Sequence, residues 1–276
     1  MNETASVHGS RASRWGMPSL LELPDAEANA RVCRELGLQF VELNMNCPEY
    51  LPDSLPAEDI HALAERFGVT FTLHLPEETD LAAFSSDVRQ GHAACVARAI
   101  DWAAAAGIGK ATMHLNRGVY FSLPDRKAWL YKVHQNLFLR NLIRSMDPLA
   151  DLCRRKGVRL LIENTGNGNL PFLQEATHSL MAQFAGPLGL TWDVGHDAAA
   201  GLADRPLIQQ YLDCVSHLHL HDFDGRSAHQ PLFSGQADIL TPLDMAVQRG
   251  WDIVIEVKTR AALEASVRAL KERSRL

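Results

Sequence analysis

Apolar and polar positions along the chain follow a two-part pattern that recurs about every 30 residues. A short apolar run comes first. A longer stretch with apolar residues at helical spacing follows it, and several of these stretches end at a glycine. The short runs predict eight strands, over residues 14–20, 38–43, 69–74, 110–115, 158–163, 188–193, 215–221 and 252–257.

The longer stretches predict helices between these strands. They cover residues 25–36, 56–67, 87–106, 125–156, 171–184, 203–213, 239–249 and 260–273. Gly37, Gly68, Gly107 and Gly157 follow four of them, as the left-handed residue that ends many helices. The stretch 125–156 is expected to break near Pro148, because proline disrupts a helix interior. Residues 116–124 are expected to form a polar and aromatic loop.

Eight strand–helix units without a linker between them predict a single-domain (β/α)₈ TIM barrel over residues 14–276. Nearly continuous apolar strands fit this fold, since parallel strands are covered on both faces. An open doubly wound sheet is the alternative, but it would need a glycine-rich phosphate turn after the first strand, and none is present. Residues 1–13 are small and polar and are expected to form a flexible N-terminal tail.

Composition limits the classes of partner. The formal net charge of −6 does not favour a strongly basic nucleic-acid surface, and no apolar run approaches the ~20 residues of a membrane span. The five cysteines form no CxxC pair, which predicts reduced thiols and a cytoplasmic location.

Most of the predicted strands end in an acidic or imidazole side chain. These side chains are Glu42, His74, His114, Glu163, Asp193, His219 and Glu256. The C-terminal ends of barrel strands surround one mouth, so the side chains are expected to meet there. Several carboxylates brought together repel one another unless cations or protons neutralise them. The pattern thus predicts at least one divalent metal ion, with Zn²⁺, Mn²⁺, Co²⁺ or Fe²⁺ favoured over Mg²⁺ or Ca²⁺.

Three histidines, His217, His219 and His221, occupy every second position of one predicted strand and share a face. A barrel mouth cannot seat all three as ligands. His217 or His221 is therefore expected to hydrogen-bond to a ligand instead of the ion. The Gly166–Asn167–Gly168 turn is only a weak phosphate-cradle pattern, and we interpret it as an ordinary loop.

Taken together, these motifs resemble the xylose isomerase-like TIM barrels. That superfamily holds sugar isomerases and epimerases as well as the endonuclease IV type of AP endonuclease, AP endonuclease family 2. The matching segments are residues 71–74, 113–114, 162–165, 193–196, 219–222, 229–239 and 255–256. They are specific for the superfamily but do not choose an activity within it.

The resemblance implies a metal site made of Glu163, Asp193, His219 and Glu256. In the 3-epimerase-like members one Mn²⁺ or similar ion binds these four positions. The two glutamates also move protons at the substrate carbon, while the metal stabilises a cis-enediolate. Contacts with the substrate are implied for His196 and Arg226, and the strand-end and loop residues Glu42, Asn116 and Lys258 are further candidates.

The first hypothesis is therefore a metal-dependent isomerase or epimerase, with a role in carbohydrate metabolism. Its substrate would be a small sugar or related hydroxy-carbonyl compound, and its ion Zn²⁺ or Mn²⁺, with Co²⁺, Fe²⁺ and Mg²⁺ as alternatives. Sugar-enzyme relatives often associate, so a homo-oligomer is compatible with the resemblance. A non-enzymatic binding subunit is disfavoured by the full ligand set. The substrate, its phosphorylation, the metal and the oligomeric state stay open.

The alternative is a zinc-dependent AP endonuclease or phosphodiesterase, whose relatives bind three zinc ions. His74 and His114, with Glu163 bridging, match a second site, and His196 and His229 match a third. The third site also needs an aspartate where this chain has Ser227, which argues against phosphodiester hydrolysis. Residues 44–84 contain one arginine and no lysine, which also disfavours DNA as the substrate.

Overall fold

The computed structural model describes residues 12–276, so most of the tail expected over residues 1–13 lies outside the described residues. Within them, eight parallel strands form a closed barrel in the order β1-β10-β9-β8-β7-β4-β3-β2. This arrangement confirms the predicted single-domain TIM barrel, and each strand lies within two residues of its predicted bounds. The strands are β1 (Arg14–Pro18), β2 (Phe40–Asn44), β3 (Thr70–His74), β4 (Lys110–His114), β7 (Arg159–Glu163), β8 (Leu188–Asp193), β9 (Val215–Leu220) and β10 (Asp252–Ile255).

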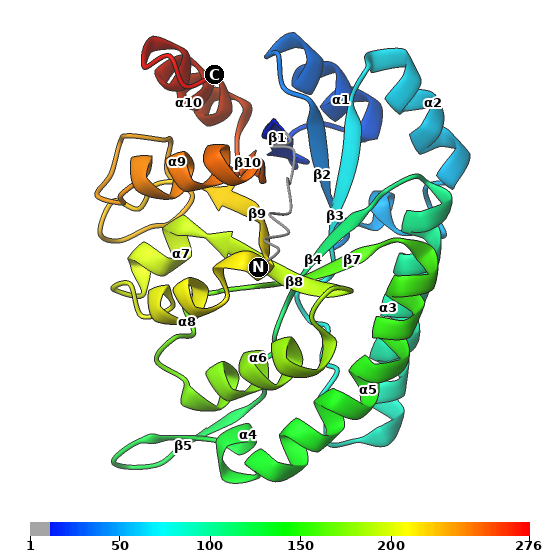
Figure 1. Ribbon diagram of the computed structural model, residues 1–276, viewed down its shortest axis with the longest axis vertical. Helices are drawn as coiled ribbons and strands as arrows, with labels where there is room; N and C mark the ends of the chain where they lie inside the picture. Colours follow the sequence, from blue (N-terminus) through cyan, green and yellow to red (C-terminus); the bar gives the residue numbers. More distant parts are fainter. Residues whose placement is uncertain (1–11) are drawn as a thin grey trace, which may run out of the picture.

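Helices surround the barrel, and α3 and α5 lie side by side along one flank (Figure 1). Those that connect barrel strands are α1 (Ala26–Glu35), α2 (Ala57–Phe67), α3 (Ser86–Ala105), α4 (Leu130–Val133), α5 (Gln135–Lys156), α6 (Pro171–Phe184), α7 (Val194–Ala199), α8 (Arg205–Gln210) and α9 (Leu240–Arg249), and α10 (Arg260–Glu272) follows the last strand. Short 3₁₀ turns occur at η1 (Pro48–Tyr50) and η2 (Leu212–Cys214). In the described part of the chain, no helix combines the length and apolar character needed to cross a membrane.

Helix α5 continues through Pro148, so the predicted break was wrong. Pro148 lies on the exposed side of the helix, whereas Met146 and Leu149 are buried in the core. Packing of that buried face outweighs the helix-destabilising effect of Pro148. The proline lies where no neighbouring element needs the helix to bend.

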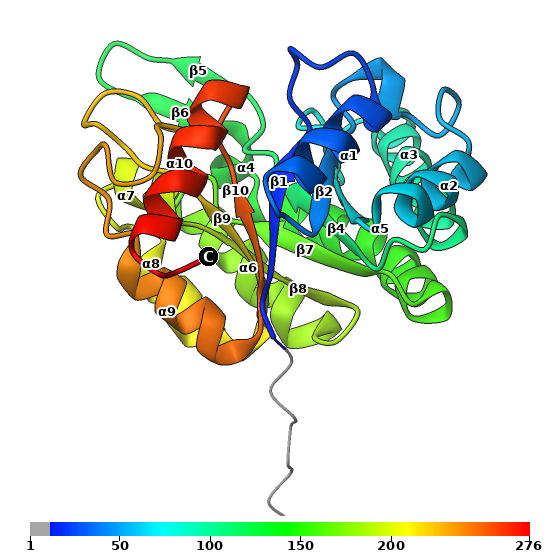
Figure 2. The same ribbon diagram turned by 90° about the horizontal axis from the view of Figure 1, so that it is seen from above.

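An antiparallel hairpin, β5 (Tyr120–Ser122) and β6 (Lys127–Trp129), replaces the predicted loop and first helical turn. The rings of Tyr120 and Trp129 lie 4.9 Å apart across the two strands, and the ammonium group of Lys127 lies 4.5 Å from the centre of the Tyr120 ring. These cross-strand contacts stabilise the hairpin. It projects on the same side of the molecule as the loop of residues 222–237, which follows β9 (Figure 2).

A buried ion cluster closes the opposite, N-terminal end of the barrel. The carboxylate of Asp252, at the start of β10, accepts hydrogen bonds of 2.8 and 2.6 Å from Arg14 of β1. It also accepts a bond of 2.7 Å from Lys110, which reaches it from β4 across the barrel. Asp252 thereby links β10 to β1 and β4.

Candidate metal centre

Four side chains of the predicted ligand set converge at the mouth of the barrel. Glu163 ends β7, Asp193 ends β8, His219 lies near the end of β9, and Glu256 follows β10. One ligand atom from each lies within 4.8 Å of the others. The Nδ1 atom of His219 is 3.2 Å from Oε1 of Glu163 and 3.0 Å from Oε2 of Glu256. Four neighbouring strands thus bring together residues that are far apart in the sequence.

These four side chains concentrate negative charge at one buried point, because three of them are carboxylates. Asp193 and His219 are fully buried, and Glu163 and Glu256 are 5% and 9% exposed. Burial alone would raise the pKa of the two glutamates, but the charge of His219 holds both pKa values well below their ordinary range. Burial would likewise lower the pKa of His219, and the nearby Glu42 and Glu163 raise it instead. The negative charge of the three carboxylates would likewise attract a divalent cation.

The donors suit such an ion. Three carboxylates and one imidazole form a mixed oxygen and nitrogen set of the kind that holds Mn²⁺, Zn²⁺ or Fe²⁺. Two further observations support the fit, because among the described residues Nδ1 of His196 is a buried atom without a hydrogen-bond partner, and Oε2 of Glu256 has only the 3.0 Å ion-pair contact with His219. Buried polar atoms are rarely unpaired, so these two point to a ligand.

Glu42 lies behind His219. Its carboxylate oxygens are each 2.8 Å from an imidazole nitrogen, Oε1 from Nε2 of His219 and Oε2 from Nε2 of His217. The hydroxyl of Thr72 donates to Oε2 at 3.1 Å. Glu42 therefore holds His219 so that Nδ1 faces the three acids, as carboxylates commonly orient metal-binding histidines. The sequence placed Glu42 among the strand-end candidate ligands and the candidate substrate contacts, but it did not predict these partners.

His221 supports Asp193. Its Nε2 donates to the Asp193 carboxylate at 3.1 Å, and its Nδ1 is 2.8 Å from the backbone nitrogen of His229 and 3.2 Å from the backbone carbonyl of Asp222. The backbone N–H of His196 also donates to that carboxylate, at 2.5 Å. His221 is thus a hydrogen-bond partner of a candidate ligand, the role that the sequence predicted for His217 or His221.

Replacing Gly195 with alanine is expected to displace His221. A Cβ atom at position 195 would lie 1.9 Å from Cε1 of the His221 ring, which is fully buried and has no room to move. We expect a loss of about 1–3 kcal/mol in the free energy of unfolding, as for other overpacked cores, together with weaker Co²⁺ binding.

Urea titration and Co²⁺ titration measure these two effects. Gly91→Ala is the matched control, because a Cβ there meets nothing within 4 Å. If Gly195→Ala is as stable and binds Co²⁺ as tightly as this control, the contact between Gly195 and His221 does not constrain the site.

His74 and His114 share one oxygen of Glu163. The Nε2 atom of each lies 3.1 Å from Oε2, and the two rings are 4.8 Å apart. Nδ1 of His74 donates to the carbonyl of Leu75 at 2.9 Å, which turns Nε2 towards Glu163. Burial disfavours an imidazolium here, but the hydrogen bond and charge of Glu163 raise the pKa of His74 to about 9. The predicted pair is therefore brought together on Glu163.

His196 and His229, predicted for a third site, lie near each other and near His221. Nitrogen atoms of the three rings lie within 4.8 Å of one another. His229 has a left-handed backbone with φ of 58°, and its Nδ1 is 3.2 Å from the carbonyl of Glu256. Burial lowers the pKa of His229 to about 4, so its ring is neutral at pH 7. Both ring nitrogens of His221 already have hydrogen-bond partners. Of these three histidines, only His196 and His229 therefore retain a ring nitrogen that could bind a ligand.

Two cavities open at the mouth. One of about 360 Å³ is lined by Glu42, Asn44, His74, Glu256 and Lys258, among others, and the Lys258 ammonium donates to Glu256 at 2.8 Å. The other, of about 270 Å³, is lined by Glu77, His114, Leu115, Asn116, Arg117, Thr165 and Asn167. Arg226 lines neither cavity. It is exposed in a turn where its backbone N–H donates to Asp224 at 2.8 Å.

Solved structures with the same fold include several sugar epimerases. A D-tagatose 3-epimerase-like protein is 22% identical with a TM-score of 0.76, over 94% of this chain and 96% of that one. A 3-keto-D-glucoside 4-epimerase from E. coli is 15% identical with a TM-score of 0.71, over 95% of this chain and 99% of that one. A D-psicose 3-epimerase, solved with D-fructose, is 13% identical with a TM-score of 0.68, over 94% and 97%.

At these identities the structural likeness establishes the fold alone. No curated protein sequence matches the chain significantly. The family model of the xylose isomerase-like TIM barrel matches residues 30–273. This match covers nearly the whole barrel, including all four residues of the candidate metal centre. The chain therefore belongs to the xylose isomerase-like TIM barrel family.

Proposed function

We propose that the protein is a divalent-metal-dependent epimerase or isomerase of a small sugar or related hydroxy-carbonyl compound. One observation carries this proposal. Two buried glutamates, Glu163 and Glu256, have carboxylate oxygens 3.2 and 3.0 Å from His219 Nδ1, and Glu256 also lines the 360 Å³ cavity. The sugar epimerases among the solved structures of the same fold support the choice of substrate class.

Epimerisation removes a proton from a carbon next to a carbonyl group and returns a proton to the other face. Two carboxylates that reach the substrate from different sides can divide these steps between them. Glu163 comes from β7 and Glu256 follows β10, with β8 and β9 between them. One would remove the proton and the other would return it. Glu163, Asp193, His219 and Glu256 would hold a divalent ion, which would stabilise the negative charge that develops on the substrate oxygens.

Other residues of the mouth would bind and orient the substrate. Nδ1 of His196 is unpaired, and the Asn116 side chain lines the smaller cavity. Burial disfavours a charged Lys258, but Glu256 raises its pKa, so its ammonium group stays charged beside the acid that it contacts. We further expect a reducing compartment such as the cytoplasm, because all five cysteines are free thiols.

Incubation with ketohexoses in D₂O tests the proposal. We expect deuterium to enter a carbon-bound position next to the carbonyl, as measured by NMR. Chelation should stop the exchange, and Mn²⁺ or Co²⁺ should restore it. The proposal is wrong if no member of a panel of ketohexoses, ketopentoses and keto-glycosides exchanges hydrogen in the presence of Mn²⁺, Co²⁺ or Zn²⁺.

The grouping of His74 and His114 on Glu163 keeps one alternative open, a zinc phosphodiesterase with more than one ion. Two features disfavour it. Ser227 stands where a third zinc would need an aspartate, and both nitrogens of His221 are occupied. Metal analysis distinguishes the two functions, since two or three zinc ions per chain with cleavage of abasic duplex DNA would favour the phosphodiesterase.

A further inference from the structure

Asn164 joins the ends of β7 and β8 through its side chain. Its Oδ1 accepts the backbone N–H of Asp193 at 2.7 Å, and its Nδ2 donates to the backbone carbonyl of Asp193 at 2.9 Å. The last backbone pairing of the two strands is between Glu163 and Thr191. The amide group of Asn164 therefore takes the place of the next pair of backbone hydrogen bonds. It ties the strand end that carries Glu163 to the backbone of Asp193.

Asp204 holds this amide in place. Its Oδ2 accepts a second hydrogen bond from Nδ2 of Asn164, at 3.2 Å, and one from the backbone N–H of Gly166, at 2.9 Å. A carboxylate accepts but does not donate, so the NH₂ group of Asn164 must face it and Oδ1 must face Asp193. Asp204 is only 3% exposed. The backbone N–H of Gly166 is therefore already bound to Asp204 and is not free for a phosphate.

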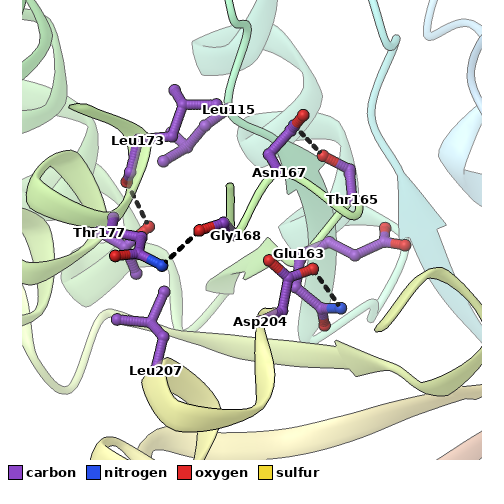
Figure 3. Close-up of a pocket in the computed structure, with 11 residues that line it drawn as sticks. Leu115, Glu163, Thr165, Asn167, Gly168, Leu173, Thr177, Asp204 and Leu207 are labelled. Carbon is purple, nitrogen blue, oxygen red and sulfur yellow. Dashed lines mark hydrogen bonds between the residues drawn. The ribbon is translucent and has the colours of Figure 1, made fainter. Parts of the chain in front are cut away.

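The loop after β7 has little freedom to move away from Asp204. Asp204, Gly168 and Glu163 line the same small cavity of about 30 Å³ (Figure 3). A Cβ atom on Gly168 would lie 2.3 Å from the carbonyl carbon of Ala203, so the two backbones are in direct contact. The contact and the hydrogen bonds together set the position of the loop that carries Asn164.

We propose that Asn164 and Asp204 are positioning residues, which set the spacing between Glu163 and Asp193 in the candidate metal centre. Neither side chain belongs to the candidate ligand set. Asn164 acts through the backbone of Asp193, and Asp204 acts through the side chain of Asn164 and the backbone N–H of Gly166. The inference rests on the proposed metal centre. Sequence reasoning named neither residue for this role, because it depends on which backbone atoms the amide of Asn164 reaches.

Co²⁺ affinity, measured by competition with a chelator, tests this inference without a substrate. Asn164→Ala removes the three side-chain hydrogen bonds, and Asn164→Asp keeps the shape but loses the NH₂ group that donates to the Asp193 carbonyl and the Asp204 carboxylate. Each is expected to weaken Co²⁺ binding by about 10- to 100-fold, the usual effect of losing a partner of a metal ligand. Asp204→Asn keeps an acceptor oxygen and is expected to weaken binding less, by about tenfold or below.

Asn167→Ala is the matched control. Asn167 lies in the same loop, but its side chain bonds only to Thr165. It is expected to bind Co²⁺ within about twofold of the wild type, a change too small for the loss of a partner of a metal ligand. If both Asn164 variants also bind Co²⁺ within twofold of the wild type, the inference is overturned. If they do not fold, as judged by circular dichroism, Asp204→Asn decides the outcome, and unchanged affinity in that variant overturns the inference.

The Co²⁺ affinity test of Asn164 and the hydrogen-exchange test of the proposed function can fail independently of each other. A wild-type protein that binds Co²⁺ but exchanges no hydrogen with any sugar would contradict the proposed reaction and leave the role of Asn164 intact. Conversely, full hydrogen exchange with unchanged Co²⁺ affinity in the Asn164 variants would support the reaction and remove the positioning role.

Discussion

Glu163→Gln is expected to lower the rate of substrate hydrogen exchange by at least about 10³-fold. The variant loses one of the two proposed proton-transfer groups and one of the three anionic candidate ligands at the same time. It also changes the acceptor that His74 and His114 share at 3.1 Å. Both the exchange rate in D₂O and the Co²⁺ affinity should therefore fall, whereas circular dichroism should show an intact barrel.

Glu78→Gln provides the control for this substitution. Glu78 is an exposed glutamate in the loop after β3 and lines neither cavity of the mouth. Its loss should leave exchange unchanged. Retention of more than about one tenth of the wild-type exchange rate by Glu163→Gln would exclude a proton-transfer role for Glu163, since such roles contribute at least about 10²-fold.

Asp252→Asn is expected to lower the free energy of unfolding by about 2–4 kcal/mol. Breaking a buried ion pair by removing one partner costs about 3–5 kcal/mol, and we reduce this because the side chains of Arg14 and Lys110 are 25% and 18% exposed. Urea denaturation measures the change, with an unchanged m value as the sign that the unfolded state is not altered.

The effect of Asp252 should also depend on pH. Burial alone would raise its pKa, but the hydrogen bond from Arg14 and the charge of Lys110 hold it well below its ordinary value. A lowered folded-state pKa contributes stability above the unfolded-state pKa of about 3.9, and that contribution is lost as the pH falls further. The difference between wild type and variant should be constant from pH 6 to 8 and shrink below about pH 4.

Asp213→Asn is the control for Asp252. Its ion pair with Arg249, at 2.7 Å, is exposed, since the Asp213 side chain is 94% accessible. Such pairs contribute at most about 1 kcal/mol. If the two variants are equally stable, the cluster at the N-terminal end of the barrel does not stabilise the fold as described.

The barrel and the convergence of its strand-end side chains were predictable from sequence for one physical reason. An apolar run that ends in an acid or a histidine places that side chain at the end of a strand, and in a closed parallel barrel all such ends meet. Strand position placed Glu163, Asp193, His219 and Glu256 at the mouth together with the other strand-end candidates, and the resemblance to the xylose isomerase-like barrels selected these four as a ligand set.

The partners of those residues were not predictable in the same way. Which imidazole nitrogen faces Glu42, and which backbone atoms the amide of Asn164 reaches, depends on the register between neighbouring strands. That register is set by packing around the whole barrel and leaves no local pattern in the sequence. The continuity of α5 through Pro148 was not predicted because core packing outweighed the local effect of the proline. The hairpin β5–β6 was not predicted because it depends on cross-strand ring contacts.

The four candidate ligands come from consecutive strands, β7 to β10. In the larger cavity, Ser19, Asn46 and Glu77 belong to loops after β1, β2 and β3, and Asn44 is the last residue of β2. The proposed reactive centre and much of the proposed recognition surface therefore occupy different halves of the barrel. Mutational libraries confined to the first three loops should shift sugar preference while sparing the catalytic machinery. The same division gives evolution a way to diversify specificity without rebuilding the chemistry.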